Sequence, residues 1–400
     1  MKVVIIGNSV GGQTVAESLL RNAEDPKDLE IVMISKEPYP YYSRIFLPHY
    51  IAEQREKDRL FVRKIDWYEK KGIHCLLGAE VSKIHPKEKS VELADSELTI
   101  KYDKLVVAIG SSPRKLDFGN PGLKGVFTLR TIADADDIKN YISKNKVKKA
   151  FIIGGGLLGI ELGYHIKDLD IQVTICEIAN YLLPRQLCAK SSQYLEDYLR
   201  NQGLEFVIGQ TVDKLVGESS IEAVKLKSGE LNETDIVMEQ LGIIPNIELA
   251  KKSGIDTEKG ICVNKFMQTN FPDIYAVGDC IQFNDKIWGI IPASMDQAKV
   301  AASHIIDGEV EPYKETIWQT KLKIAGLDLL SVGTPEPEND EVAEVLWKID
   351  KDHYVCRKVI YQDDKLTGAI LMGPGADTRF FIQNLGENVK LDELKEKIDN

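Results

Sequence analysis

The chain has 400 residues, of which 43% are hydrophobic and 28% are charged. This composition is typical of a globular protein, and the length is sufficient for two or three domains. The formal net charge of −11 disfavours a nucleic-acid partner, because phosphate binding requires basic patches. No apolar run in the sequence approaches the length of a transmembrane helix, so we expect no membrane partner.

Six cysteines are scattered along the chain, and no C-x-x-C pair occurs. This spacing fits neither a disulfide framework nor a zinc site, so we expect reduced thiols and no metal. The N-terminus enters the first predicted strand directly, which leaves no room for a signal peptide. The sequence therefore predicts a cytoplasmic protein.

The chain opens with a predicted strand, a glycine turn and a predicted helix. Residues 3–6 are branched and apolar, which indicates a strand buried on both faces. A turn at Gly7 and a helix over residues 11–22 follow, and this order aims a helix N-terminus at a phosphate. Ser9 replaces the second glycine of the usual G-x-G-x-x-G pattern, so its Cβ crowds a pyrophosphate. Taken alone, the motif also fits a strand-turn-helix without a ligand.

The second predicted parallel strand covers residues 29–35 and is followed by Lys36 and Glu37. In a dinucleotide site, the end of this strand reaches the adenosine ribose. Ser35 and Glu37 are both able to accept a ribose hydroxyl group, and Lys36 is able to stack or to face solvent; the residues alone do not rank the three. The irregular segment 38–50 is rich in aromatic residues, and is either a flavin wall or a packed surface loop.

Residues 149–177 repeat the N-terminal pattern with a complete fingerprint. Gly154, Gly156 and Gly159 have the G-x-G-x-x-G spacing between a predicted strand and a predicted helix. The next strand ends at Glu177, about 20 residues further on, where an acid binds a ribose 2′-hydroxyl group. A carboxylate there repels a 2′-phosphate, which favours NAD over NADP. Two such repeats predict two cofactors that face each other.

Segments 108–113 and 242–245 match each other, because each has a glycine, two residues and a proline after an apolar strand. Each stands where its nucleotide fold would end, so we expect the second dinucleotide domain to be inserted into the first. The predicted fold class is α/β, with two Rossmann-like dinucleotide-binding domains and a C-terminal α+β interface domain. The predicted limits are 1–112 with 244–312, then 113–243, and 313–400.

Another predicted buried strand ends at Gly278 and Asp279. This places an acid at the carboxyl end of a strand, where ligands collect in α/β sheets. A helix is predicted to begin near Pro292, because proline suits the first turn of a helix. If this N-terminus points at a flavin ring, its positive dipole end stabilises the anionic reduced flavin.

These motifs resemble those of the pyridine nucleotide-disulfide oxidoreductase superfamily over essentially the whole chain. In pattern, the chain is similar to members without a redox disulfide: NADH:rubredoxin reductases, oxygenase-coupled ferredoxin reductases and the flavoprotein portion of NADH-dependent nitrite reductases. The resemblance implies FAD on the first domain and NADH on the inserted domain, with the nicotinamide stacked against the flavin. The motifs that carry it are Gly7 to Gly12, Ala108-Ile109-Gly110, Gly154 to Glu161, Gly242 with Pro245-Asn246, and Ala276 to Asp279.

The resemblance also implies roles for single residues. Asp279 would hydrogen-bond the ribityl chain, and Arg130 would approach the FAD pyrophosphate. Val81 would contact the adenine through its backbone. Ile291 would flank the isoalloxazine, and Glu161 would lie near the nicotinamide.

Ile45 stands where peroxide-reducing or CoA-disulfide-reducing relatives have their redox cysteine. A thiolate is needed to attack a disulfide or a peroxide, so disulfide reduction and the reduction of oxygen to water are not expected. Cys280 is interpreted as a small packing residue beside the flavin. Arg44 and His49 are candidates for tuning the flavin. The predicted site residues are Glu161, Arg44 and His49 as catalytic residues, and Gly7, Ser9, Gly11, Gly12, Ser35, Glu37, Val81, Ala108, Gly110, Arg130, Gly154, Gly156, Leu158, Gly159, Glu177, Gly242, Gly278, Asp279 and Ile291 as cofactor-binding residues.

The predicted reaction passes a hydride from NADH to FAD, and electrons then pass to a small carrier protein such as a rubredoxin, a ferredoxin or another iron-sulfur protein. Two alternatives stay open: an NADH oxidase that forms peroxide from oxygen, and a flavin-bearing redox sensor or assembly partner without turnover. The residues do not identify the acceptor. They also leave the oligomeric state open, with a homo-oligomer as one option.

Overall fold

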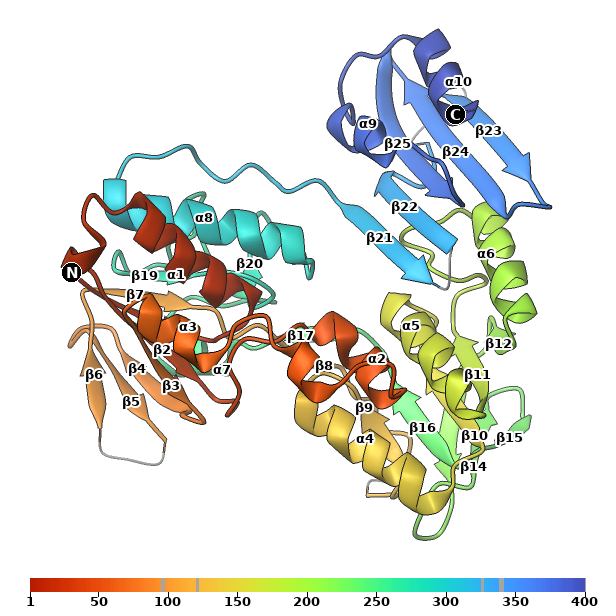
Figure 1. The fold of residues 1–400 in the computed structure, drawn as a ribbon, viewed down its shortest axis with the longest axis horizontal. Helices are drawn as coiled ribbons and strands as arrows, with labels where there is room; N and C mark the ends of the chain where they lie inside the picture. The colour runs from red at the N-terminus through yellow and green to blue at the C-terminus, as the bar shows by residue number, and fades with distance from the viewer. Residues whose placement is uncertain (95–97, 120–121, 325–326, 338–341, 400) are drawn as a thin grey trace. The chain divides into compact units, whose positions relative to one another are not determined.

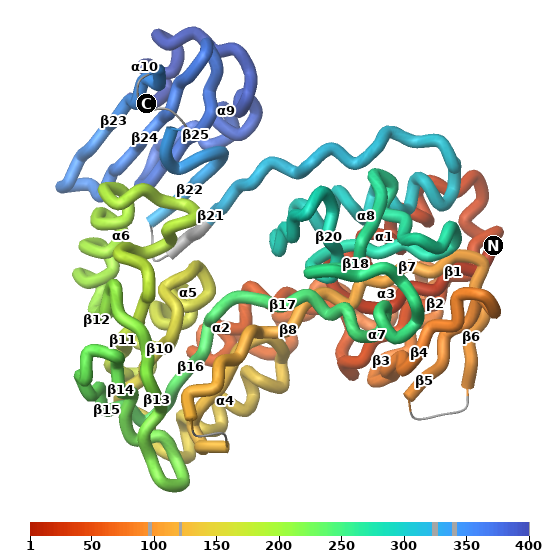
Figure 2. The backbone as a smooth tube through the Cα atoms, turned by 180° about the vertical axis from the view of Figure 1, so that it is seen from behind, coloured from red at the N-terminus to blue at the C-terminus, as the bar shows by residue number. Residues whose placement is uncertain are grey.

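The computed structural model describes residues 1–94, 98–119, 122–324, 327–337 and 342–399. Figures 1 and 2 show the fold from opposite sides. The chain forms two compact units, each made of three chain segments. Unit 1 comprises Met1–Ile45, Glu56–Pro113 and Ile243–Thr316, and unit 2 comprises Phe46–Arg55, Arg114–Gly242 and Ile317–Asn400.

The core of unit 1 is a parallel sheet with the strand order β19-β7-β1-β2-β3. Its strands are β1 (Lys2–Ile6), β2 (Glu30–Ser35), β3 (Ile73–Leu77), β7 (Lys104–Val107) and β19 (Ile274–Ala276). The central strand β1 carries Val3, Val4 and Ile5, which are fully buried, as expected for a strand covered on both faces. Helices α1 (Val10–Asn22) and α8 (Ile291–Asp307) pack against each other beside this sheet (Figure 1).

Smaller elements complete unit 1. An antiparallel sheet joins β4 (Val81–His85), β5 (Ser90–Leu93) and β6 (Thr99–Lys101), and β18 (Ile261–Cys262) pairs with β20 (Ile281–Gln282). The short helices are η1 (Pro26–Asp28), η3 (Lys57–Leu60), α3 (Ile65–Lys70) and α7 (Glu248–Lys252), and η2 (Arg44–Phe46) contains the end of the first segment.

The two matching segments noted in the sequence lie side by side. β8 (Ser111–Pro113) pairs antiparallel with β17 (Ile243–Pro245). Asn246 strengthens this pairing, because its backbone N–H donates to the Gly110 carbonyl oxygen at 3.0 Å and its Nδ2 donates to the Ile109 carbonyl oxygen at 2.9 Å. The points where the chain leaves unit 1 and returns to it are therefore fixed to each other.

Unit 2 contains a second parallel sheet with the strand order β12-β11-β10-β16-β9. The strand before the glycine turn is again central, and the next strand of the nucleotide fold lies beside it, as in unit 1. The strands are β9 (Val126–Thr128), β10 (Lys149–Ile153), β11 (Gln172–Glu177), β12 (Leu204–Ile208) and β16 (Ile236–Glu239). The accompanying elements are α4 (Ile132–Asn145), α5 (Leu157–Ile166), η4 (Lys167–Leu169), α6 (Ala189–Asn201) and the antiparallel strands β13 (Val212–Val216), β14 (Ala223–Leu226) and β15 (Leu231–Glu233).

The C-terminal part of unit 2 is an antiparallel sheet with the order β21-β22-β25-β24-β23. Buried side chains of the sheet, among them Leu330 and Val359, form a core with Phe381 and Leu394 from two helices. The elements are β21 (Gln319–Ile324), β22 (Leu327–Gly333), β23 (Glu344–Asp350), β24 (Val355–Gln362), β25 (Lys365–Met372), α9 (Thr378–Gln383) and α10 (Leu391–Asp399).

One segment departs from a simple division along the chain. Phe46–Arg55, with helix α2 (Leu47–Ile51), belongs to unit 2, although the residues on both sides of it belong to unit 1. Its Tyr50 hydroxyl group donates to Oδ1 of Asp136 on α4 at 2.6 Å. Sequence patterning did not indicate this placement, because it depends on side-chain contacts between residues far apart in the chain.

Candidate dinucleotide-binding sites

The glycine turn of unit 1 brings β1, α1 and the end of β7 into close contact. Gly7 has φ +115°, and a Cβ atom there would lie 2.1 Å from the carbonyl oxygen of Ala108. At Gly12, a Cβ atom would lie 2.0 Å from the carbonyl oxygen of Gly7. Only glycine fits at these two positions, because any side chain would overlap with the backbone.

Ser9 is accommodated without backbone strain. It is the N-cap residue of α1 and has an extended backbone, with φ −118° and ψ −165°. Its hydroxyl group accepts a hydrogen bond from Nη1 of Arg44 at 3.1 Å rather than capping the helix. Helix α1, all of whose residues are described, has no acidic residue in its first turn. Its N-terminus therefore keeps free N–H groups and a positive dipole end for an anion.

Arg44 connects Ser9 to the residues that follow β2. Nη2 of Arg44 lies 2.6 Å from Oε1 of Glu37, and the Tyr42 hydroxyl group donates to Oε2 of Glu37 at 2.6 Å. Burial raises the pKa of Tyr42, so this hydroxyl group stays a donor. The Ser35 hydroxyl group donates to the carbonyl oxygen of Glu37 at 3.1 Å. Four residues that the sequence predicts for the site thus form one cluster.

This cluster fits a bound pyrophosphate. Nε of Arg44 is buried and has no hydrogen-bond partner among the described residues, so the guanidinium group has a donor to spare. A guanidinium group binds phosphate oxygens strongly, because the hydrogen bond is charge-assisted. The sequence placed Arg44 at the flavin wall, whereas the structure places its side chain on Ser9 and Glu37. Its predicted tuning role stays a prediction.

The remaining predicted FAD residues of unit 1 follow the carboxyl ends of neighbouring parallel strands. Oδ2 of Asp279 accepts a hydrogen bond from the Ser111 hydroxyl group at 3.0 Å. The N–H group of Gly278 donates to Oε1 of Gln297 on α8 at 2.9 Å, which fixes the turn before Asp279. Since Gly7, Glu37, Ala108 and Asp279 follow β1, β2, β7 and β19, one edge of one sheet carries them all. Val81 and Gly110 also lie in unit 1, and Ile291 is the half-exposed first residue of α8.

The glycine turn of unit 2 repeats this geometry. Gly154 has φ +114°, and a Cβ atom there would lie 2.3 Å from the carbonyl oxygen of Gln240. A Cβ atom at Gly159 would lie 2.0 Å from the carbonyl oxygen of Gly154. Gly156, the N-cap residue of α5, differs, since a Cβ atom there would meet nothing within 4 Å in the described part of the chain. Its backbone therefore borders open space, as the approach of a pyrophosphate would require.

Glu177 lies at the end of β11 and is only 9% exposed. Its Oε2 accepts a hydrogen bond from the N–H group of Gly155 at 2.8 Å, and its Oε1 accepts one from Ala179 at 2.9 Å. Two backbone amides thus hold the carboxylate beside the glycine turn. Leu158 and Glu161 lie on α5, and burial raises the pKa of the Glu161 carboxyl group to about 7. Such a group is able to exchange protons near neutral pH.

His49 lies in unit 2 and stacks on a residue that sequence reasoning missed. Its ring centroid is 3.8 Å from that of His165 on α5, with 38° between the ring planes. Burial lowers the pKa of His165 to about 4, and burial together with Arg55 lowers the pKa of His49. Both rings are therefore neutral near pH 7. The tuning role predicted for His49 stays a prediction.

Two other predicted residues lie in unit 2. The N–H group of Arg130 donates to Oδ2 of Asp134 at 3.0 Å at the start of α4. The carbonyl oxygen of Gly242 accepts a hydrogen bond from the N–H group of Arg114 at 2.9 Å. The contact predicted between Arg130 and FAD stays a prediction.

The cysteines do not supply a reactive thiol at these sites. Cys280 is fully buried, and burial raises the pKa of its thiol to about 12. All six cysteines lie within the described ranges and are free. No group of three or more His, Cys, Asp or Glu residues that could hold a metal ion occurs in the described residues. Within the same ranges, the helices are too short or too polar to cross a membrane.

The chain matches known proteins over nearly its whole length. Residues 1–304 match the family model of pyridine nucleotide-disulphide oxidoreductases, and residues 319–381 match that of the rubredoxin NAD+ reductase C-terminal domain. An NAD(P)H nitrite reductase from Bacillus subtilis is 31% identical over 376 residues, which is 94% of this chain and 46% of the relative. The NADH-rubredoxin oxidoreductase of Clostridium acetobutylicum is 33% identical over 372 residues, 93% of this chain and 91% of the relative.

Solved structures agree with these relatives. A ferredoxin reductase from Rhodopseudomonas palustris superposes with a TM-score of 0.88 at 25% identity, covering 100% of this chain and 98% of the other. The chain spans about half the length of the first two curated relatives that it matches, 46% and 51%. The matches confirm the predicted family, the α/β fold class, and FAD and NAD as the cofactors.

Substitutions at two glycines of the unit 2 turn distinguish an effect on folding from an effect on cofactor binding. Gly159→Ala introduces an overlap with the Gly154 carbonyl oxygen, so we expect the free energy of unfolding to fall by about 1–3 kcal/mol. Gly156→Ala meets open space, so its melting temperature stays close to that of the wild type, while the KM for NADH rises about tenfold or more. Thermal melts and steady-state kinetics measure both. An unchanged KM in Gly156→Ala would contradict the assigned pyrophosphate position.

The histidine stack predicts a pH dependence. Because the folded state lowers both pKa values, its contribution to stability is present above about pH 6.5 and is lost as the pH falls towards 4. His165→Phe keeps an aromatic ring and removes the titration. Between pH 7 and pH 5, we therefore expect its free energy of unfolding to fall by about 1 kcal/mol less than that of the wild type, after allowance for solvent screening. His74→Phe, at an exposed position of β3, is the control and keeps the wild-type pH dependence. Equal pH dependence of His165→Phe and the wild type would refute this account.

Proposed function

Because the chain belongs to the pyridine nucleotide-disulphide oxidoreductase family, we propose that it oxidises NADH by hydride transfer to FAD and reduces a small electron-carrier protein. The observation that carries the proposal is the presence of two glycine turns at equivalent places in two parallel sheets, in each of which the central strand before the turn has the next strand of the fold on one side and a later strand on the other. In this proposal, residues 1–112 with 244–312 bind FAD, residues 113–243 bind NADH, and residues 313–400 form the interface domain.

Residues of unit 1 would hold FAD. The N-terminus of α1 and the Arg44 guanidinium group would neutralise the pyrophosphate, and the Ser9 hydroxyl group lies between them. Glu37 and Ser35 would accept hydrogen bonds from the hydroxyl groups of the adenosine ribose. The Asp279 carboxylate would accept a hydrogen bond from the ribityl chain. Bound FAD supplies the chemistry, because a flavin accepts a hydride and releases single electrons.

Residues of unit 2 would orient NADH. The pyrophosphate of NADH would lie against the open backbone at Gly156. The carboxylate of Glu177 would accept a hydrogen bond from the 2′-hydroxyl group of the adenosine ribose. Glu161 would lie near the nicotinamide. With a pKa near 7, its carboxyl group can ionise there, and the carboxylate would stabilise the positive charge that the nicotinamide ring gains on oxidation.

A carrier protein is the acceptor that the chain supports best. The relatives from Clostridium acetobutylicum and Rhodopseudomonas palustris are named as reductases of rubredoxin and of ferredoxin, and the C-terminal region matches a rubredoxin reductase domain. By the resemblance, Ile45 would stand where disulfide-reducing relatives have a redox cysteine, and the Cys280 thiol is buried and protonated. The cytoplasm, where thiols stay reduced, is the compartment that we propose from the six free cysteines.

The acceptor is tested by NADH oxidation with and without oxygen. We expect slow NADH oxidation with oxygen alone, and a rate at least tenfold higher under anaerobic conditions when rubredoxin or another iron-sulfur protein is added. Oxygen consumption that matches NADH oxidation and does not respond to carriers would identify a peroxide-forming oxidase instead. A stable complex of NADH with the flavoprotein, without turnover, would identify a redox sensor.

The coenzyme preference tests Glu177. We expect kcat/KM for NADH to exceed that for NADPH by about tenfold or more, because the carboxylate repels a 2′-phosphate. Glu177→Gln removes the charge and should reduce this ratio. Glu205→Gln is the matched control, since it makes the same change on the neighbouring strand β12, where the carboxylate contacts Gln172 and Thr174. Equal use of NADPH and NADH by the wild type would disprove the assignment.

A further inference from the structure

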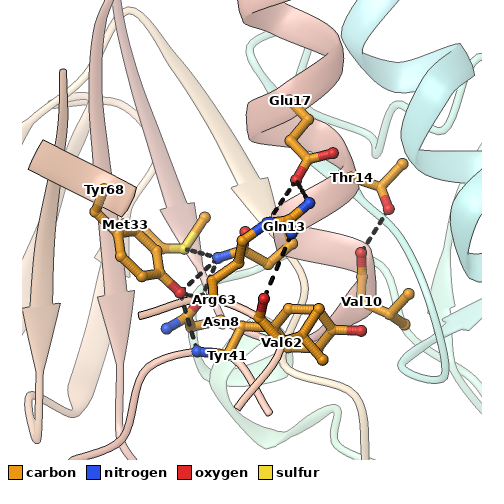
Figure 3. Close-up of polar contacts among 10 residues, drawn as sticks. All are labelled: Asn8, Val10, Gln13, Thr14, Glu17, Met33, Tyr41, Val62, Arg63 and Tyr68. Atoms are coloured by element: carbon orange, nitrogen blue, oxygen red, sulfur yellow. Dashed lines mark hydrogen bonds and ion pairs between the residues drawn. The ribbon is translucent and has the colours of Figure 1, made fainter. Parts of the chain in front are cut away.

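The glycine turn of unit 1 rests on a polar network that the proposed function does not use (Figure 3). Nε2 of Gln13 donates to Oδ1 of Asn8 at 2.6 Å and to the Tyr68 hydroxyl oxygen at 2.7 Å. The Tyr68 hydroxyl group donates to Oδ1 of Asn8 at 2.9 Å. These three residues come from helix α1, the turn between Gly7 and Ser9, and helix α3. The network therefore connects the turn to two helices.

The Tyr68 hydroxyl group is the centre of this network. It also accepts a hydrogen bond from the backbone N–H group of Tyr41 at 3.0 Å. One donated and two accepted bonds use the full hydrogen-bonding capacity of a hydroxyl group. Tyr68 is 1% exposed, and burial raises its pKa to about 12, so the hydroxyl proton stays in place for Asn8.

Tyr41 extends the network to the segment that carries Arg44. The carbonyl oxygen of Tyr41 accepts a hydrogen bond from the N–H group of Arg63 at 3.1 Å, and the Arg63 side chain pairs with Glu17 on α1 at 2.8 Å. Tyr41 is thus held at both of its backbone polar groups. Its N–H group bonds to Tyr68, and its carbonyl oxygen bonds to Arg63, whose side chain pairs with α1. Tyr41 lies three residues before Arg44, whose Nη1 donates to the Ser9 hydroxyl group at 3.1 Å.

We propose that the Tyr68 hydroxyl group is a positioning group for FAD binding, which holds both the Asn8 turn and the Tyr41 segment in the conformation that presents Ser9 and Arg44. The inference rests on the proposed function, because it takes the first glycine turn as the FAD site. Tyr68 acts through Asn8 and Tyr41 rather than on the cofactor.

The buried surroundings explain why one hydroxyl group has this effect. Without it, an N–H donor of Gln13 loses its acceptor at a buried place, and the N–H group of Tyr41 loses its acceptor at a partly buried one. Buried donors without acceptors are costly, so the turn and the segment move to find new partners. Gln13 is 3% exposed, and its Oε1 has no hydrogen-bond partner within the described ranges, so the network already lacks one donor, and loss of the Tyr68 O–H group would remove another.

The test compares two tyrosine variants of the full chain. Tyr68→Phe removes the central hydroxyl group, and we expect the dissociation constant of FAD for the apoprotein to rise about tenfold, measured by flavin fluorescence. The circular dichroism of the bound flavin should change as well. Tyr102→Phe is the matched control: Tyr102 is 3% exposed in the same core, and its hydroxyl group has no hydrogen-bond partner among the residues described. This control should bind FAD like the wild type.

Hydrogen exchange of the apoproteins gives a readout that does not need the cofactor. In Tyr68→Phe, the amide of Tyr41 and the bonded amides on either side of the turn, those of Gly7 and Gln13, should exchange faster, while the rest of unit 1 keeps its protection. Uniformly faster exchange, as from a general loss of stability, would overturn the inference. So would wild-type FAD affinity and wild-type exchange in Tyr68→Phe.

A second variant keeps the test decisive if Tyr68→Phe does not fold. Asn8→Leu removes the acceptor through which the Tyr68 hydroxyl group holds the turn, so FAD binding should weaken while the amide of Tyr41 stays protected by Tyr68. Unchanged FAD affinity in this variant would contradict the inference. If the wild type itself binds no FAD, the proposed function fails, whereas the exchange of the Tyr41 amide still decides whether Tyr68 positions the segment.

Discussion

The close approach between Gly7 and the carbonyl oxygen of Ala108 is the contact on which unit 1 depends. A Cβ atom at Gly7 would lie 2.1 Å from that oxygen, so the turn can pack on the end of β7 only because the atom is absent. This packing brings the N-terminus of α1 to the edge where four parallel strands end. The same constraint recurs in unit 2 between Gly154 and Gln240. Two backbone contacts of one kind thus place a helix N-terminus, which favours anions, at the edge of each sheet.

Charge then distinguishes the two edges. In unit 1, a half-buried guanidinium group donates to the N-cap residue of α1 and pairs with Glu37, so a cationic group lies beside the place proposed for the pyrophosphate. In unit 2, a carboxylate held by two backbone amides lies beside the turn and disfavours a second phosphate group. The assignment of FAD to unit 1 and of NADH to unit 2 agrees with this difference. Ser9, which departs from the glycine pattern, provides an acceptor for the guanidinium group that a glycine would lack.

The sequence predicted the backbone features of both edges. The branched apolar runs before Gly7 and Gly154 indicated the central strands, and the spacing to Glu177 indicated the acid of the second fold. These features are local, since a strand, a tight turn and a helix N-terminus depend on neighbouring residues. The pairing of β8 with β17 was less direct, but the two matching segments indicated that the chain leaves and re-enters one domain.

The side-chain contacts were beyond the reach of patterning. The stack of His49 on His165, the bond from Arg44 to Ser9 and the network around Tyr68 join residues that are distant in the chain. Which residues form such contacts depends on how helices and strands pack together, and the periodicity of the sequence carries no information about that packing. Gln13 is the exception that the sequence itself indicates, because it is a long polar residue in the part of α1 that buries Val15, Ala16 and Leu19. A polar residue on a buried helix face needs partners, and the glycine turn supplies one of them.

The most direct test of the account is hydrogen exchange of the apoprotein with each cofactor added alone. The account predicts that FAD protects the amides of residues 8–12 and leaves those of residues 155–160 unchanged, and that NAD+ protects residues 155–160 only. Protection of the second turn by FAD, or of the first turn by NAD+, would contradict the assignment of the two dinucleotides to the two units.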